Sequence, residues 1–238
     1  MTTFRPLPVL TAFTLLALAI LIGLGAWQLQ RRAEKHELID QIAARAGAGP
    51  APVEILFATG KYATYRHATA YGAFDHTREA YVYWPRAEPP RPGFKVVTPF
   101  HLVSGATILV DRGWVDETSK APDRRAKGQV ADELELTGTL QPSARPNTFT
   151  PPPDLANRTF YARDTTAIAK ALGISLSNPV VVFEASTSVP GGPEPLESKL
   201  EIPDNHLQYA LTWFALAVVL LIVYLRLHYV RDRLRFSR

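Results

Sequence analysis

The sequence predicts a membrane protein in which two transmembrane α-helices flank a β-rich α+β domain. Two observations indicate the spans: Val9–Leu29 and Leu207–Leu225 contain no charged side chain, and each is long enough to cross a bilayer. A third observation indicates the domain: between the two spans, short β-branched and aromatic runs alternate with turns rich in proline and glycine. We therefore expect one translocated domain held between two membrane anchors.

The first apolar run has the length of a transmembrane helix. Its 21 residues would rise about 31 Å as a helix, close to the roughly 30 Å thickness of the hydrocarbon layer. A signal peptide has a shorter apolar region and a small-residue cleavage site, whereas this run ends in Trp27–Arg32. The sequence thus predicts a cytoplasmic N-terminus at residues 1–8 and an uncleaved transmembrane helix at residues 9–30.

The central segment, residues 31–205, is predicted to form the β-rich domain. The first helix should continue through Glu37–Ala46, whose apolar residues share one face. A short helix is expected at Thr165–Leu172 and a hairpin turn at Ser104–Gly105, and the Pro/Gly/Ser-rich Ser186–Pro203 indicates a strap that returns to the membrane. The expected strands are His67–Phe74, Glu79–Trp84, Phe94–Phe100, Ala106–Val110, Glu133–Leu140, Thr159–Arg163 and Pro179–Glu184.

The distribution of basic residues sets the expected orientation. The second span is predicted at residues 206–225, and the basic tail at residues 226–238 carries five arginines and one aspartate, which accounts for the whole net charge of +4. Because basic residues are enriched on the cytoplasmic side, both termini are expected in the cytoplasm. Arg31 and Arg32 break this rule locally, which hints at a function. With eight residues before the first span, the sequence favours a bacterial inner membrane, or the mitochondrial inner membrane for a trimmed organellar protein.

Composition excludes several classes of function. The chain has no cysteine, and its single methionine is Met1, which rules out disulfides, iron–sulfur clusters, covalent c-type haem and thiolate metal sites. Zero net charge outside the tail argues against a nucleic-acid partner. No nucleophile elbow, His-Glu-x-x-His motif or P-loop is present. We predict that the protein is not an enzyme, and a hydrolase assembled from distant Ser, His and Asp residues is the alternative.

The candidate binding site lies where the second span meets the domain side of the membrane. His206 is placed at this border, and Tyr209 and Trp213 follow it on about the same helical face. A neutral imidazole can bind haem iron as an axial ligand, and the two aromatic rings would then lie against the porphyrin. The alternative is that His206 caps the helix and contacts lipid headgroups.

The first span presents a matching set of residues at about the same depth. Arg31, Arg32 or Lys35 would pair with haem propionates, and Trp27 would contact the ring. The alternatives are contacts of the arginines with lipid phosphate and interfacial anchoring by Trp27.

Two further features indicate that the spans pack together. Gln28 and Gln208 are expected to hydrogen-bond between the helices. Ala19 and Gly23 form a pair of small residues four apart, which would let the second helix approach closely.

Four blocks of sequence carry a family resemblance. They are Leu24–Arg32 with Lys35, Tyr71–Phe74, Gly93–Phe100 with Ile108–Val115, and Asp204–Phe214 (DNHLQYALTWF). In this order and with two spans, they resemble the Surfeit locus protein 1 family, membrane proteins that assist cytochrome c oxidase assembly, over nearly the whole chain. The family more often has asparagine where this chain has Asp111 and Asp204.

The resemblance implies an assembly factor for haem–copper oxidase that holds haem a transiently, without a covalent bond, and aids its insertion into oxidase subunit I. Its partners would be that subunit, the haem a synthesis machinery and the lipid bilayer. The resemblance carries over His206 as the haem-binding residue and hypothetical axial ligand of the iron. The alternative is a haem-free membrane scaffold that stabilises oxidase assembly intermediates. For Asp111–Trp114, expected to form a turn at the end of a strand, the resemblance implies no particular role.

Overall fold

A computed structural model describes residues 3–58, 63–187, 189–196, 204–231 and 234–235. The chain forms two compact units, one made of residues 1–41 with 200–238 and the other of residues 42–199. Each unit has its own packing, and the two are connected through the chain at both ends of the second unit.

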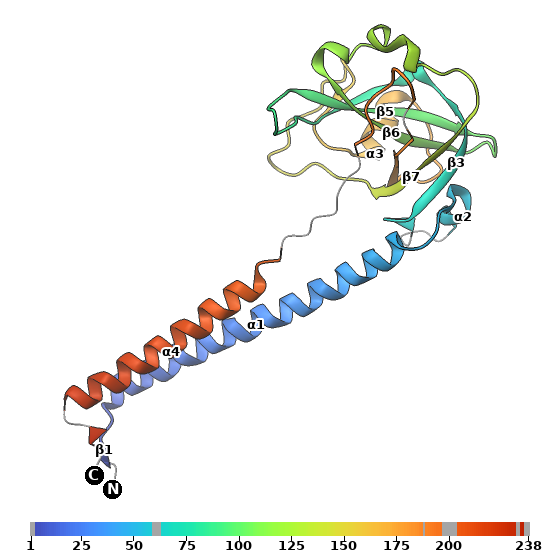
Figure 1. Cartoon of the computed structure of the whole chain (residues 1–238). Helices are drawn as coiled ribbons and strands as arrows, with labels where there is room; N and C mark the ends of the chain where they lie inside the picture. The colour runs from blue at the N-terminus through green and yellow to red at the C-terminus, as the bar shows by residue number, and fades with distance from the viewer. Residues whose placement is uncertain (1–2, 59–62, 188, 197–203, 232–233, 236–238) are drawn as a thin grey trace. The chain divides into compact units, whose positions relative to one another are not determined.

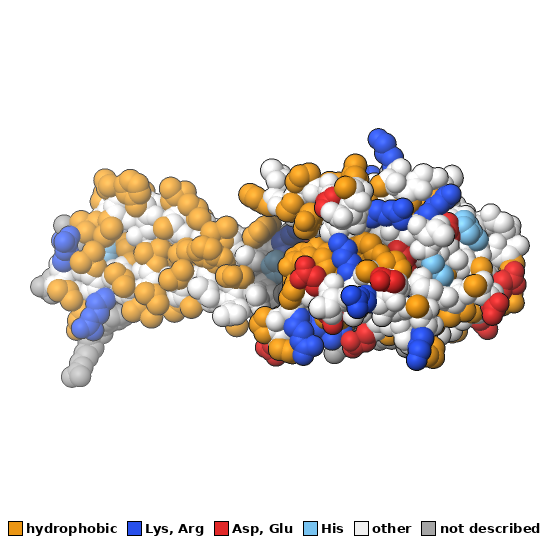
Figure 2. All heavy atoms as spheres, turned by 90° about the horizontal axis from the view of Figure 1, so that it is seen from above, with side chains coloured by type: hydrophobic (Ala, Val, Ile, Leu, Met, Phe, Trp, Pro, Cys, Tyr) orange, Lys and Arg blue, Asp and Glu red, His pale blue; other side chains and the backbone are white. Residues whose placement is uncertain are grey.

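The first unit contains α4 (His206–Val230) and, as far as residue 41, the long helix α1 (Pro8–Ala46). The two helices run side by side in opposite directions (Figure 1). Both are long and apolar enough to cross a membrane. Many of their large apolar side chains are exposed, and hydrophobic atoms cover most of the visible face of the pair in Figure 2. Together with the β-rich unit between them in the sequence, these helices confirm the predicted fold class.

The strands β1 (Thr3–Phe4) and β10 (Leu234–Arg235), near the two ends of the chain, lie together at one end of the helix pair (Figure 1). They pair antiparallel. Nearby, the side-chain oxygens of Thr11 and Tyr224 lie 2.7 Å apart and join α1 to α4. This arrangement is compatible with the predicted topology, in which both termini share one side of the membrane.

Small residues let the two helices pack closely. Three buried residues of α4 recur every seven positions, the spacing that keeps one seam facing a partner helix: Ala210, Ala217 and Tyr224. On α1 a Cβ added at Gly25 would lie 2.5 Å from the Phe214 ring, whereas one added at Gly23 would meet no described residue within 4 Å. The close approach predicted at Gly23 is therefore wrong and occurs at Gly25.

Gly25→Val is expected to lower the melting temperature of the helix pair, because the added side chain overlaps Phe214 and overpacking costs about 1–3 kcal/mol. Gly23→Val is the matched control, since it makes the same change in helix propensity at an open position. The melting temperature of each variant is measured by circular dichroism of the full-length protein in detergent. Equal melting temperatures of the two variants would contradict the packing at Gly25.

The second unit is built on a sheet that closes on itself (Figure 1). The strand order is β2-β3-β7-β9-β6-β5-β4-β8, and an additional pairing of β3 with β5 closes β3, β7, β9, β6 and β5 into a small barrel. The strands are β2 (Ala51–Pro52), β3 (His67–Phe74), β4 (Ala80–Tyr83), β5 (Gly93–Leu102), β6 (Thr107–Asp116), β7 (Leu134–Pro142), β8 (Thr159–Phe160) and β9 (Val181–Ala185). The helical elements are α2 (Val53–Phe57), α3 (Thr165–Leu172), and the 3₁₀ helices η2 (His76–Arg78), η3 (Glu117–Ser119) and η4 (Pro122–Gly128).

Apolar side chains fill both faces of the central strands. One cluster contains Val110 and Phe183, and a second contains Leu109 and Val182 together with Ile168 of α3. Because successive residues of a strand point to opposite faces, chain neighbours such as Leu109 and Val110 join different clusters. The two-faced burial explains why these strands are almost continuously apolar in the sequence.

The predicted domain elements are confirmed in kind and revised in length. Helix α3 covers the predicted Thr165–Leu172, begins at the N-cap Asp164 and ends at Gly173, whose φ is 66°. The hairpin at Ser104–Gly105 joins β5 to β6 as predicted. Strand β6, however, runs six residues past its predicted end at Val110, and this extension contains the motif that the sequence placed in a turn.

Candidate functional site

His206 starts α4 and hydrogen-bonds across to α1. Asp204 Oδ1 accepts the backbone N–H of His206 at 3.1 Å, which satisfies one of the free amides at the start of the helix. On the ring, Nδ1 lies 2.7 Å from Oε1 of Gln28, as the predicted interhelical role of Gln28 requires. An amide oxygen can only accept, so Nδ1 carries the proton and Nε2 keeps a lone pair. No described residue hydrogen-bonds to Nε2.

Asp204 links the start of α4 to two further residues of α1. Its Oδ2 lies 2.7 Å from His36 Nε2 and 3.6 Å from Arg32 Nε. Gln28, Arg32 and His36 are spaced four residues apart, so they form one stripe along α1. The hydrogen bond from the backbone of His206, followed by that from His36, lowers the pKa of Asp204. Asp204 is thus a carboxylate that joins the helices and does not hydrogen-bond to the imidazole of His206.

A pocket of about 320 Å³ opens beside His206, and its other lining residues are Arg31, Glu34, Lys35 and Leu38. Arg31 Nη1 and Glu34 Oε2 lie 2.7 Å apart, and the charged side chains of the lining are those two together with Lys35. The volume lies in the range of about 300–1,000 Å³ that is typical of small-molecule sites. An imidazole nitrogen beside a net positive wall fits haem, which needs an axial ligand and counter-charges for its propionates.

The basic residues predicted for the site take different places. Arg31 lines the pocket with His206, whereas Arg32 is engaged by Asp204. His36, which also contacts Asp204, was not predicted. Its four-residue spacing from Gln28 and Arg32 was the available signal, but a charged stripe beyond a span is usually a solvated face.

The aromatic residues predicted for the site do not line the pocket. Trp27 is 52% exposed and Tyr209 is 54% exposed, and Trp213 is partly buried. Helix geometry explains the position of Trp27, because consecutive residues turn by about 100° and Gln28 occupies the seam. Contact of these three side chains with haem stays a prediction.

A second group of motif residues lies inside β6. Lys95 pairs with Trp114 and Val97 with Asp111, which leaves an extra residue on β6, and Gly113 at this bulge has a φ of 112°. The turn predicted here is therefore wrong. Asp111 continues the strand in spite of its charge because its carboxylate lies 3.0 Å from the Lys95 ammonium, and both side chains are buried.

The bulge receives residues 189–196 of the predicted strap Ser186–Pro203, and the name strap is kept for these residues from here on. Residues 188 and 197–203 of that segment lie outside the described residues. Trp114 and Glu194 exchange two backbone hydrogen bonds, of 2.7 and 2.9 Å. A Cβ on Gly113 would overlap the carbonyl of Glu194, so glycine permits this approach. Arg86 contacts both partners: its guanidinium lies 4.1 Å from the centre of the Trp114 ring and 2.7 Å from the Glu194 carboxylate. The motif therefore holds the strap on β6.

Arg112 joins a buried charge cluster next to the strap. Glu79 accepts hydrogen bonds from Arg112 Nη1 at 3.0 Å and from Arg125 Nη2 at 2.5 Å, and Arg112 Nη2 donates to the carbonyl of Gly128. Burial opposes ionisation of Glu79, but two kinds of contact outweigh it and lower its pKa to about 2: hydrogen bonds from His76 and Arg125 and the positive charges of both arginines. The cluster ties β6 and η4 to the residue before β4.

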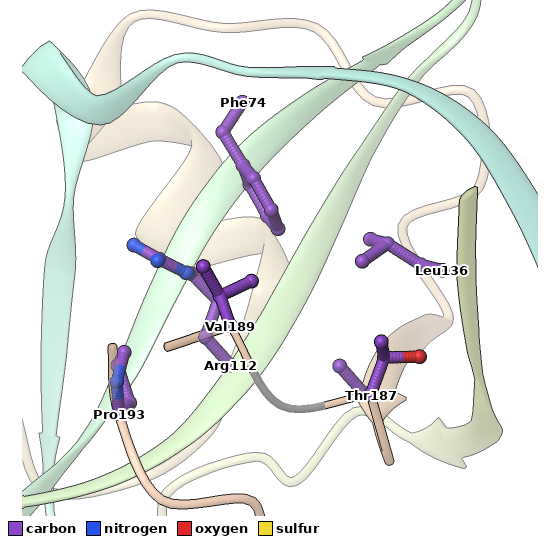
Figure 3. A pocket seen from close by; sticks show the side chains of 7 residues that line it. Phe74, Arg112, Leu136, Thr187, Val189 and Pro193 are labelled. Atoms are coloured by element: carbon purple, nitrogen blue, oxygen red, sulfur yellow. The ribbon is translucent and has the colours of Figure 1, made fainter. Parts of the chain in front are cut away.

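A small cavity lies behind the strap (Figure 3). Phe74, Arg112, Leu136 and Val189 are among the residues that line it, and its volume is about 10 Å³. That is room for at most one water molecule. The cavity is therefore far too small for haem, and the Arg112 guanidinium beside it packs against the Phe74 ring with 4.7 Å between them.

Comparison with known proteins gives a consistent result. A family model described as the SURF1 family matches residues 15–218. The chain is 34% identical over 221 residues to Surfeit locus protein 1 of Takifugu rubripes, covering 86% of this chain and 90% of that protein. It is 34% identical over 212 residues to human Surfeit locus protein 1, covering 82% and 69%. A SURF1-like protein of Rickettsia conorii is 29% identical over 209 residues, covering 86% and 85%.

Proposed function

Because this chain belongs to the SURF1 family, we propose that it is an assembly factor for a haem–copper oxidase of the cytochrome c type, and that it binds haem a and aids its insertion into oxidase subunit I. The observation that supports this most directly is the pocket beside His206, where Nε2 has no described hydrogen-bond partner and two cationic side chains lie close by. The proposal consists of binding and release and contains no catalytic step.

Each group at the pocket has a part in the proposed binding. His206 would hold the iron of haem through Nε2, and Arg31 and Lys35 would provide positive charge for the propionates. Haem would supply an iron that a neutral imidazole can ligate. Because this chain has no cysteine for covalent attachment, the bound group is held by bonds that can break again, which suits transfer to subunit I.

The proposed location is the bacterial inner membrane, with both termini in the cytoplasm and the domain translocated. The length and composition of α1 and α4 support a membrane location. The arginines of the tail support the orientation, because basic residues favour the cytoplasmic side. In this arrangement the pocket beside His206 lies at the translocated border of the membrane, where it can meet subunit I.

His206→Ala is expected to lose most of the bound haem, because the axial bond is removed while the helix pair is kept. The test is the pyridine haemochrome of full-length protein purified from cells that make haem a. His67→Ala, which changes an exposed histidine of β3, is the control and should retain haem. Equal retention in His206→Ala and wild type would show that the ligand assignment is wrong.

A haem-free scaffold is the second candidate, and one feature of the domain favours it. Trp84 is 46% exposed, and the exposed rings of Tyr83 and Tyr161 lie 6.0 Å apart. Exposed aromatic side chains are enriched at protein interfaces. If full-length His206→Ala without haem still co-purifies with oxidase subunits and supports their assembly, the scaffold function is favoured over haem delivery.

A further inference from the structure

We propose that Gln28 is a positioning residue for His206: it fixes the proton on Nδ1 and so presents Nε2 to a ligand in the neighbouring pocket. This inference rests on the proposed haem binding, because it assigns the ligand atom of that same site. Gln28 does not line the pocket and acts through the imidazole ring.

The position of Gln28 is set by packing on both sides of it along α1. One turn earlier, Gly25 lets α1 lie against Phe214. One turn later, Arg32 pairs with Asp204. The amide is thus held at the level where α4 begins, and its oxygen reaches the His206 ring at 2.7 Å.

The orientation of the Gln28 amide, with its oxygen toward the ring, selects the tautomer of His206. A neutral imidazole has one N–H, which either nitrogen can carry, and an acceptor beside Nδ1 keeps the proton there. A histidine that ligates a metal usually donates its other N–H to such an acceptor, which orients the ring and raises the basicity of the ligating nitrogen. The contact between Gln28 and His206 is an arrangement of this kind.

A neutral partner suits a carrier that must release its ligand. Asp204, the carboxylate of this cluster, is occupied by the backbone of His206 and by His36. A carboxylate on Nδ1 would make Nε2 a stronger donor to iron, whereas the amide of Gln28 orients the ring with a smaller gain in basicity. Gln28 therefore favours ordered but reversible binding.

The tautomer is measured first, on protein without haem. Full-length protein in detergent, labelled with ¹⁵N at its six histidines, is compared for wild type, Gln28→Leu and Gln41→Leu, and His206→Ala identifies the signals of His206. Gln41 is a matched control because it lies on the same helix and hydrogen-bonds to Glu37. We expect protonated Nδ1 in wild type and Gln41→Leu, and a shift toward protonated Nε2 in Gln28→Leu.

Haem retention is then measured on the same variants purified from cells that make haem a. Gln28→Leu is expected to bind haem about 10–100-fold more weakly, the usual effect of losing a partner of a metal-ligating histidine. Gln28→Glu is expected to hold haem more tightly and to lower its reduction potential. A merely structural role for Gln28 would not move the potential in this direction.

The outcomes separate this inference from the proposed function. An unchanged His206 tautomer in Gln28→Leu overturns the inference, whether or not haem is bound. A wild type that binds no haem, although its tautomer depends on Gln28, overturns haem binding and leaves the control of the tautomer standing. If wild type binds haem and both Gln28 variants match it in retention and potential, the positioning role is overturned and the proposed function remains.

Discussion

Glu79→Gln is expected to lower the free energy of unfolding of the β-rich domain by about 3–5 kcal/mol, the usual effect of breaking a buried ion pair. Glu79 balances Arg112 and Arg125, and the three side chains are at most 4% exposed. An amide cannot balance two cations, so the variant leaves positive charge buried without its counter-charge. Urea denaturation of the full-length protein in detergent, followed by proteolysis of the domain, measures the loss.

Two further variants show whether the lost charge of Glu79 causes the loss of stability. Glu135→Gln changes an exposed glutamate of β7 and should alter the stability by no more than about 0.5 kcal/mol. Glu79→Gln combined with Arg125→Met removes one of the two cations and should recover part of the loss. If the combined variant is less stable than Glu79→Gln alone, the charge explanation is wrong.

The same carboxylate makes the stability of the domain depend on pH. The pKa of Glu79 is about 2 in the folded protein and 4.5 ordinarily, so its contribution is complete above pH 4.5 and is lost as the pH falls from 4.5 toward 2. That difference in pKa corresponds to about 3 kcal/mol. Denaturation at pH 7 and pH 3 should therefore show a larger decrease for wild type than for Glu79→Gln.

The sequence predicted the helices well but not the face on which they meet. A run without charges and about 30 Å long indicates a span by its length alone. In a membrane the lipid chains are as apolar as leucine, so the seam between helices carries no hydrophobic signal. The choice between Gly23 and Gly25, and between Trp27 and Gln28, depends on contacts with α4. Sequence spacing therefore placed Arg31 near His206, but it missed His36 and gave Trp27 a place that the pocket lining does not include.

The domain was hardest to predict where charged residues are buried. The strand ending at Val110 was expected to give way to a turn, because Asp111 and Arg112 are residues typical of a surface. Their partners lie far away in the sequence, Lys95 for the aspartate and Glu79 for the arginine. Such pairing cannot be read from local periodicity, so β6 was predicted too short and the role of its bulge was missed.

Gly113→Ala is expected to release the strap from β6. Gly113 has a φ of 112°, where a residue with a side chain costs about 1–3 kcal/mol. The added methyl would also overlap the carbonyl of Glu194. The strap can avoid this overlap only by giving up its hydrogen bonds with Trp114, so we expect a total loss of about 3 kcal/mol or more. Hydrogen exchange of the full-length protein should show faster exchange at the amides of Trp114 and Glu194.

Gly105→Ala separates the backbone strain from the overlap. Gly105 also has a positive φ, of 85°, but a Cβ there would meet no described residue within 4 Å, so we expect a loss of about 1 kcal/mol and an unchanged strap. If Gly113→Ala is as stable as wild type and its Glu194 amide is still protected from hydrogen exchange, the role given to Gly113 is refuted. Haem retention should stay near that of wild type in both variants, because the pocket beside His206 is lined by residues of α1 and α4. Release of the strap from β6 is therefore expected without a loss of bound haem.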